Sequence, residues 1–183
     1  MDKEMTVSEL LVKMTEYSQG NLHDIGHFMK VYAYARTIAK CEGVSPFEQK
    51  VIEAAAVLHD IACPLCREKY GNTNGRYQEL EGIALTEQFL KDSGLPGEMI
   101  RRIVWLVGHH HTLNPVDGID HRILLEADYL VNAEESNYSA ANIQNAKAKL
   151  FQTRTGTALL QSVYGCVKED SDSSFKDYNE RKN

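Results

Sequence analysis

Residues 45–64 read SPFEQKVIEAAAVLHDIACP, and this stretch decides the fold. It begins with the signature of a helix start, because the Ser45 hydroxyl can cap the first turn, Pro46 has no backbone N–H to leave unpaired, and Glu48 can reach back to the cap. Apolar residues then recur at helical spacing. The pattern predicts a buried helix that carries a His-Asp dipeptide near its far end.

The chain on either side of this stretch continues the helical pattern. We expect Cys63-Pro64 to end the helix, because proline lacks an amide donor. The sequence shows no strand-like alternation bounded by tight turns. Three further helices are expected to end near Gly20, Gly43 and Gly94. Another is expected to begin at Pro96, and the next contains the apolar residues of Ile123–Val131. Two more helical segments are expected at about 139–152 and 156–166. The sequence therefore predicts an all-α fold, a single-domain helical bundle.

Composition and charge narrow the class of protein. The 183 residues are 43% hydrophobic, and 20 Lys and Arg against 26 Asp and Glu give a net charge of −6. An acidic chain is not expected to bind a nucleic acid polymer. No apolar run approaches the ~20 residues that span a bilayer, and the first residues do not resemble a signal peptide. We therefore expect no membrane partner, a cytoplasmic location and reduced cysteines.

The domain boundaries expected from the sequence are simple. Residues 1–20 form an N-terminal helix that packs on the core, residues 21–166 form the helical domain, and residues 167–183 form a polar C-terminal tail. The sequence contains no internal repeat and no interdomain linker. One hydrophobic core is therefore expected.

Four polar residues stand inside or at the end of apolar helical stripes: His27, His59, Asp60 and Asp128. Burial of histidine and aspartate is costly unless the groups are paired or bind a metal. Helix bundles hold metal ions with ligands that project inward from facing helices. The four residues therefore predict one divalent cation shared by three helices.

These residues resemble a known family. His27-x-x-x-Val31, Ala54–Ile61 and Glu126–Leu130 look like the H…HD…D tetrad of the HD-domain metal-dependent phosphohydrolase superfamily, in particular its small stand-alone hydrolases. The resemblance runs from about residue 22 to 134. It implies a helical bundle of the HD-domain type in which the tetrad binds the metal. The earlier dipeptide His23-Asp24 is not the central one, because no histidine precedes it.

A second metal site is suggested by His109, His110 and His111. In binuclear members of the family, two further histidines hold a second ion. The later of these two ligand positions would be filled here by His110, or failing that by His111 or His109. At the earlier position those members have a histidine before a glycine, and this chain has Glu81. That carboxylate could bind the second ion, act as a general base, or be an exposed helix residue. The sequence does not distinguish among Fe, Mn, Mg, Zn, Ni and Co as the metal.

The resemblance also implies the reaction. Asp60, shared between two ions, would present metal-activated water to the phosphorus of a small phosphorylated substrate, expected to be a nucleotide or dinucleotide. Lys30, Lys69 and Arg76 are candidate phosphate-binding cations, or ordinary solvated residues. Two alternatives stay open: a di-iron oxygenase on the same frame, and a metal- or nucleotide-binding regulator without turnover. The chain could also form a homodimer.

Cys63 and Cys66 are expected to be reduced thiols in a turn beside the site. His121 is expected at the surface, and Asp24 is expected to cap the helix that carries His27.

Overall fold

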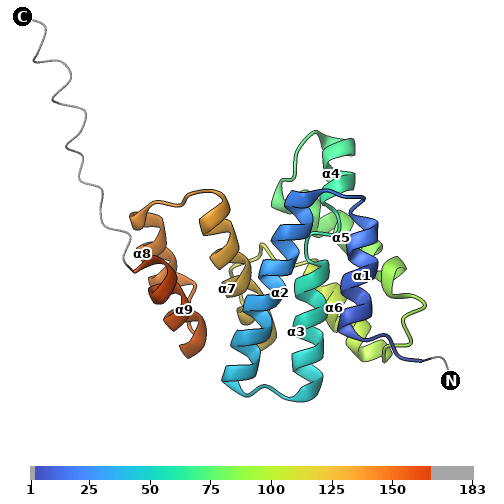
Figure 1. Cartoon of the computed structure of the whole chain (residues 1–183), viewed down its shortest axis with the longest axis horizontal. Coiled ribbons are helices and arrows are strands. Elements are labelled where there is room, and N and C mark those ends of the chain that lie inside the picture. Colours follow the sequence, from blue (N-terminus) through green and yellow to red (C-terminus); the bar gives the residue numbers. More distant parts are fainter. Residues whose placement is uncertain (1–2, 166–183) are drawn as a thin grey trace, which may run out of the picture.

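The computed structural model of the chain describes residues 3–165, which fold into nine helices (Figure 1). The described residues contain no strand, so the prediction of an all-α fold is confirmed. The helices are α1 (Val7–Tyr17), α2 (Leu22–Glu42), α3 (Pro46–Leu58), α4 (Cys63–Tyr70), α5 (Gly75–Leu90), α6 (Gly97–Val107), α7 (Gly118–Glu135), α8 (Ala140–Lys149) and α9 (Arg154–Tyr164). Residue 166 and the expected tail over 167–183 lie outside the described residues.

Helix α3 is the centre of the bundle. It packs against α1, α2, α6 and α7, and every residue from Val51 to Leu58 is buried. All of these residues are apolar except Glu53, whose carboxylate accepts hydrogen bonds from Arg36 and Gln49. A helix buried on nearly all sides is stable only when other helices surround it. The run Ala54–Ala56 adds small side chains, which let the neighbouring backbones approach closely. Helix α2 in turn packs on both α3 and α7, so these three helices form the frame of the site (Figure 1).

The start of α3 is as the sequence predicts. The Ser45 hydroxyl accepts a hydrogen bond from the backbone N–H of Glu48 at 3.2 Å, and the Glu48 carboxylate accepts one from the backbone N–H of Ser45 at 2.9 Å. The preceding helix ends at Gly43, whose φ of 73° lies in the left-handed region that glycine enters without strain. Local chemistry thus fixes the α2–α3 corner.

The expected end of α3 is wrong. The helix stops at Leu58, and Cys63-Pro64 begins α4 instead of ending α3. Proline in the first turn of a helix costs no hydrogen bond, because the N–H groups of that turn have no intrahelical partner. Both thiols of the pair, Cys63 and Cys66, are free and buried in α4, so they do not lie in a turn.

The start of α2 also differs from expectation. Asn21 caps the helix by accepting the backbone N–H of Asp24, whereas Asp24 lies in the first turn and pairs with Arg67 of α4. An acid in the first turn is stabilised there by the helix dipole. Within residues 3–165, no helix combines the length and apolarity that crossing a membrane requires.

Candidate metal centre

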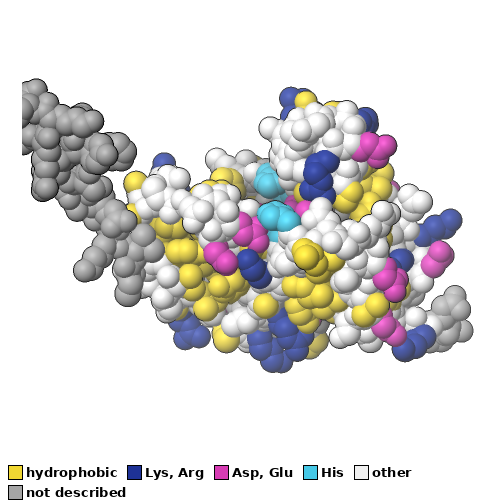
Figure 2. Space-filling model, turned by 45° about the horizontal axis from the view of Figure 1, so that its top comes forward, with side chains coloured by type: hydrophobic (Ala, Val, Ile, Leu, Met, Phe, Trp, Pro, Cys, Tyr) yellow, Lys and Arg dark blue, Asp and Glu magenta, His cyan; other side chains and the backbone are white. Residues whose placement is uncertain are grey.

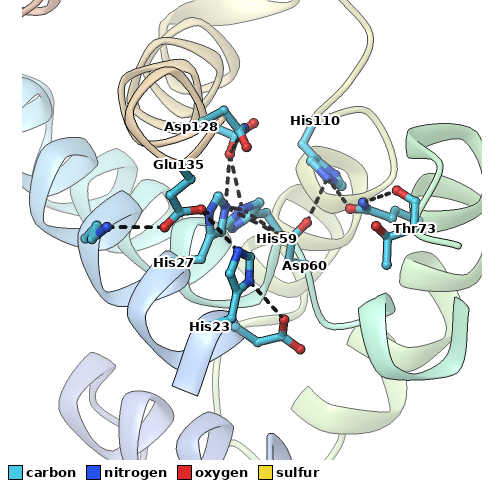
Figure 3. A network of polar contacts seen from close by, with 12 residues as sticks. His23, His27, His59, Asp60, Thr73, His110, Asp128 and Glu135 are labelled. Atoms are coloured by element: carbon cyan, nitrogen blue, oxygen red, sulfur yellow. Dashed lines mark hydrogen bonds and ion pairs between the residues drawn. The ribbon is translucent and has the colours of Figure 1, made fainter. Parts of the chain in front are cut away.

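Three packed helices bring the predicted tetrad together (Figure 3). His27 projects from α2 and Asp128 from α7, while His59 and Asp60 follow the last turn of α3. His27 and His59 are buried, with 4% and 0% of their surfaces exposed. Because α2 packs on both α3 and α7, all four side chains point into the space between these helices.

The distances between the donor atoms suit a shared cation. His27 Nε2 lies 3.1 Å from His59 Nε2 and 3.2 Å from Asp128 Oδ1. His59 Nε2 lies 3.5 Å from the same Asp128 oxygen. Asp60 Oδ2 lies 3.5 Å from His27 Nε2 and 3.7 Å from His59 Nε2. Ligand atoms about 2.1 Å from one cation lie roughly 3.0–3.4 Å from each other, so the cluster needs little adjustment to hold one.

Hydrogen bonds behind the rings fix which nitrogen faces the cluster. The Nδ1–H of His27 donates to Glu135 Oε2 at 2.8 Å. The Nδ1–H of His59 donates to the carbonyl oxygen of Ala56 at 2.8 Å. In a neutral imidazole the other nitrogen then carries a lone pair. When both rings are neutral, the two Nε2 atoms therefore face each other with their lone pairs. A cation placed between them could bind both nitrogens and both carboxylates.

The pKa shifts show how strongly the cluster attracts positive charge. Burial alone would lower the pKa of His27, but hydrogen bonding to Asp128 and the negative charge of Asp60 outweigh burial and raise this pKa to about 9. Burial alone would raise the pKa values of Asp60 and Asp128, but the neighbouring histidines hold both well below their usual range. The same field that retains a proton would stabilise a divalent cation.

A second group of potential ligands shares Asp60 with the first. It consists of Asp60, His110 and His111. His110 donates its Nδ1–H to the carbonyl of Val107 at 2.7 Å, which leaves Nε2 facing Asp60 Oδ1 at 3.5 Å. Asp60 thus turns one oxygen toward each group. Such a carboxylate can bridge two ions.

Gln78 of α5, which the sequence analysis missed, completes this second group. Its Nε2 donates to the carbonyl of Thr73 at 2.8 Å, so its Oε1 faces the Nε2 atoms of His110 and His111, each 3.2 Å away. Partial desolvation of the ring by the neighbouring residues and the adjacent His110 lower the pKa of His111. His111 therefore stays neutral and can hydrogen-bond or bind a metal.

Glu81, the expected ligand or general base, belongs to neither group. Its Oε1 accepts hydrogen bonds from Lys69 Nζ at 2.6 Å and from the Tyr70 hydroxyl at 2.5 Å. These two partners lower the pKa of Glu81. Gln78 lies three residues before Glu81, one helical turn away on the same face of α5. This spacing is the only indication in the sequence that could have identified Gln78.

The three expected phosphate-binding cations have other surroundings. Lys30 lies 3.2 Å from a Glu134 oxygen and 3.3 Å from a Glu135 oxygen. Lys69 pairs with Glu81, and Arg76 is exposed at the second position of α5. None of these cations lines the cavity next to the cluster.

That cavity has a volume of about 470 Å³ and opens beside the cluster. It is bounded by α7, α8 and the segment that follows α6. Its walls include His110, His111, Leu113, Leu125, Asp128, Tyr129, Asn132, Tyr138, Asn142, Asn145, Ala146, Lys149 and Leu150. Figure 2 shows histidine and acidic side chains gathered in a hollow on the face it presents.

Helix α7 carries further residues that the sequence analysis did not single out. Asn132 donates to Asp128 Oδ1 at 2.8 Å, and Glu135 orients His27. Asp128, Asn132 and Glu135 follow one another at helical spacing, so they share one face. That spacing is visible in the sequence and could have identified both residues.

The expectation that His121 lies at the surface is wrong. The side chain is fully buried, its Nδ1 accepts the backbone N–H of Asp117 at 3.2 Å, and its Nε2–H donates to the carbonyl of His109 at 2.9 Å. The ring also packs edge-on against Trp105. Both ring nitrogens are therefore engaged with the backbone, and His121 ties the turn before α7 to the end of α6.

Comparisons with known proteins agree with this architecture. A family model described as HD domain matches residues 24–133. A solved structure, described as a predicted HD superfamily hydrolase from an uncultured Thermotogales bacterium, is similar with a TM-score of 0.66. The two chains are 23% identical, and the match covers 90% of this chain and 88% of that chain. At this identity the likeness shows the fold. No curated protein matches the chain.

Proposed function

The chain belongs to the HD-domain family, and from this premise we propose that it is a metal-dependent phosphohydrolase. Its substrate is a small phosphorylated metabolite of the nucleotide or dinucleotide class. One observation carries the proposal: two buried imidazole nitrogens and two carboxylates face a common point beside an open cavity. Burial of such a donor set is costly unless the groups pair with one another or bind a cation, and the cavity beside it leaves room for substrate.

In this proposal each residue of the cluster has a role. His27, His59, Asp60 and Asp128 hold one divalent ion, and Asp60, His110 and His111 hold a second one. A divalent cation supplies water of lowered pKa and neutralises charge on phosphate oxygens. The protein's own contribution is orientation: Glu135 aims His27, and Asn132 aims Asp128.

The charge of the cluster favours a phosphate substrate. With neutral imidazoles, Asp60 and Asp128 carry two negative charges. One divalent ion offsets them, and a second ion leaves a net positive site that attracts a phosphate. Phosphoryl transfer depends mainly on positioning and on stabilisation of charge, which this arrangement provides.

The test is phosphate release by the metal-loaded protein. Metal-free protein would be loaded separately with Mn(II), Fe(II), Co(II), Ni(II), Zn(II) and Mg(II), and incubated with nucleotides, dinucleotides and simple phosphate esters. We expect at least one metal to support hydrolysis, seen as inorganic phosphate from a phosphate monoester or nucleotide and as two nucleotides from a dinucleotide. We expect chelator and His59→Ala to abolish it. Metal-loaded protein that hydrolyses none of these substrates, judged by phosphate release and by nucleotide products, would contradict the proposal. Substrate-dependent oxygen uptake with Fe(II) would indicate an oxygenase instead.

A further inference from the structure

The outer wall of the cavity comes from a helix that the family match does not include. The match ends at residue 133, whereas α8 covers Ala140–Lys149. The metal cluster is built from α2, α3, α7 and the end of α6, so the shared chemistry of the family lies on the inner wall. The family match therefore assigns no role to the residues that α8 presents to the cavity.

Each of the two facing helices lines the cavity with one stripe. The positions on α7 are Leu125, Asp128, Tyr129 and Asn132, and those on α8 are Asn142, Asn145, Ala146 and Lys149. Both sets have the spacing i, i+3, i+4, i+7, which places their members on one helix face. The Tyr129 hydroxyl donates to the carbonyl of Asn142 at 3.0 Å and holds the helices together. The cavity thus has a metal-binding side and a side without metal ligands.

The side chains of α8 favour a neutral group and an anion. Asn142 and Asn145 each offer a hydrogen-bond donor and an acceptor. Lys149 is exposed and has no acidic partner within residues 3–165, whereas Lys147 on the same helix donates to Gln161 at 2.7 Å. Among the described residues that line the cavity, Asp128 alone carries a carboxylate. A cationic ligand therefore finds no counter-charge away from the metal cluster.

Two tyrosine rings, inclined at 57° to each other, add apolar surface to the same cavity. The ring centroids of Tyr129 and Tyr138 lie 5.5 Å apart, and both side chains are half-buried. Aromatic rings of this kind stack on planar groups, and amides hydrogen-bond their edges. The volume of about 470 Å³ lies in the range that holds ligands of drug or nucleotide size, far more than a phosphate alone.

We propose that α8 selects the substrate by two features beyond the reacting phosphate. A planar, uncharged, hydrogen-bonding group of nucleoside size lies against Tyr138, Asn142 and Asn145, and a further anionic group pairs with Lys149. This inference rests on the proposed function for the position of the reacting phosphate at the metal cluster. It assigns specificity to residues that touch no metal.

Binding of analogues that cannot be hydrolysed tests the inference. The probes are the α,β-methylene analogues of adenosine and guanosine diphosphate, and methylenediphosphonate as the same anion without a nucleoside. Their dissociation constants would be measured by calorimetry on the metal-loaded protein. We expect at least one nucleoside analogue to bind about tenfold more tightly than methylenediphosphonate, because only the nucleoside analogue fills the cavity.

Two pairs of variants locate the contacts. Lys149→Ala should weaken binding of the nucleoside analogue about tenfold, and Asn145→Ala should reduce its advantage over methylenediphosphonate. The matched controls are Lys147→Ala and Gln144→Ala, which change α8 outside the cavity and should stay within about twofold of the wild type. Equal binding of all probes, or equal effects of Lys149→Ala and Lys147→Ala, would overturn the inference.

Failure of the inference and failure of the proposed function give different results. Tight, Lys149-dependent binding without hydrolysis of any natural nucleotide or dinucleotide would refute the hydrolase and leave the role of α8 standing. Phosphate release from glycerol phosphate and nucleotides with equal kcat/KM would establish the hydrolase and refute selection by α8.

Discussion

Replacing Glu135 by alanine should weaken the binding of divalent metal by about 10- to 100-fold, or about 1.4–2.8 kcal/mol. The Glu135 carboxylate accepts the Nδ1–H of His27 at 2.8 Å and so holds Nε2 toward the cluster as a lone pair. Without this acceptor, the His27 ring can rotate or carry its proton on Nε2, where a proton competes with the metal. The lost negative charge also reduces the attraction for a cation.

Glu134→Ala is the matched control for this variant. Glu134 lies next to Glu135, and both contact Lys30, Glu134 at 3.2 Å and Glu135 at 3.3 Å. The side chain of Glu134 is 60% exposed, whereas that of Glu135 is 16% exposed. The two variants remove the same charge, and only one removes a partner of His27. We expect the control to keep its metal affinity within about twofold.

The assay is a competition titration in which the protein and a chromophoric chelator share Mn(II) or Zn(II), with circular dichroism to check that each variant is folded. Equal metal affinity of Glu135→Ala and wild type would refute the orienting role of Glu135. An equal loss in Glu134→Ala would show that net charge, and not the hydrogen bond to His27, sets the affinity.

The remaining predictions concern Glu81, the pH dependence of metal binding, and the α3 helix. Glu81→Gln should leave the metal stoichiometry unchanged, because the Glu81 carboxylate is bound by Lys69 and Tyr70 and not by a metal. Elemental analysis of the variant measures the stoichiometry, and loss of one equivalent of metal would contradict the prediction. The pKa of His27 is raised from 6.5 to about 9, so its proton stabilises the metal-free fold fully below pH 6.5 and this stabilisation is lost as pH rises toward 9. Metal must displace that proton, so the rise in Tm caused by saturating metal should grow from pH 6.5 to pH 9, and a pH-independent shift would count against histidine ligation. Ser45→Ala should cost about 1 kcal/mol through loss of the N-cap, measured by urea unfolding of the metal-free protein, and an unchanged free energy of unfolding would show that the cap does not matter.

Local chemistry explains why the sequence predicts most of the helices. Ser45, Pro46 and Glu48 act within one turn, so their effect needs no knowledge of the rest of the chain. The end of the same helix is different, because Cys63-Pro64 is compatible both with a helix end and with a helix start. Only the packing of α4 against α5 decides between the two, and such packing is not local.

The candidate site likewise contains some residues that the sequence identifies and others that only the three-dimensional contacts identify. His27, His59 and Asp128 stand out in the sequence because polar residues interrupt apolar stripes. Gln78 does not, since a glutamine in a polar helix start is unremarkable until Thr73 and His110 are seen around it. The cavity wall on α8 is likewise invisible in the sequence, because exposed amides and lysines are common on any helix.

His121 illustrates a further limit. A histidine beside a turn is usually solvated, and its neighbours in the sequence do not indicate burial. The ring is buried because the turn before α7 folds back on the end of α6, where it meets the carbonyl of His109 and the indole of Trp105. Contacts between segments that are separate in the sequence decide its burial.

The central claim is that His27, His59, Asp60 and Asp128 share a divalent cation. Its most direct test is the metal content of untagged protein and of His59→Ala, each loaded, dialysed and analysed by inductively coupled plasma mass spectrometry. The account predicts at least about one equivalent of tightly held metal in the wild type, and about one equivalent less in a variant that remains helical. Equal metal content in the two proteins, or no retained metal in the wild type, would contradict it.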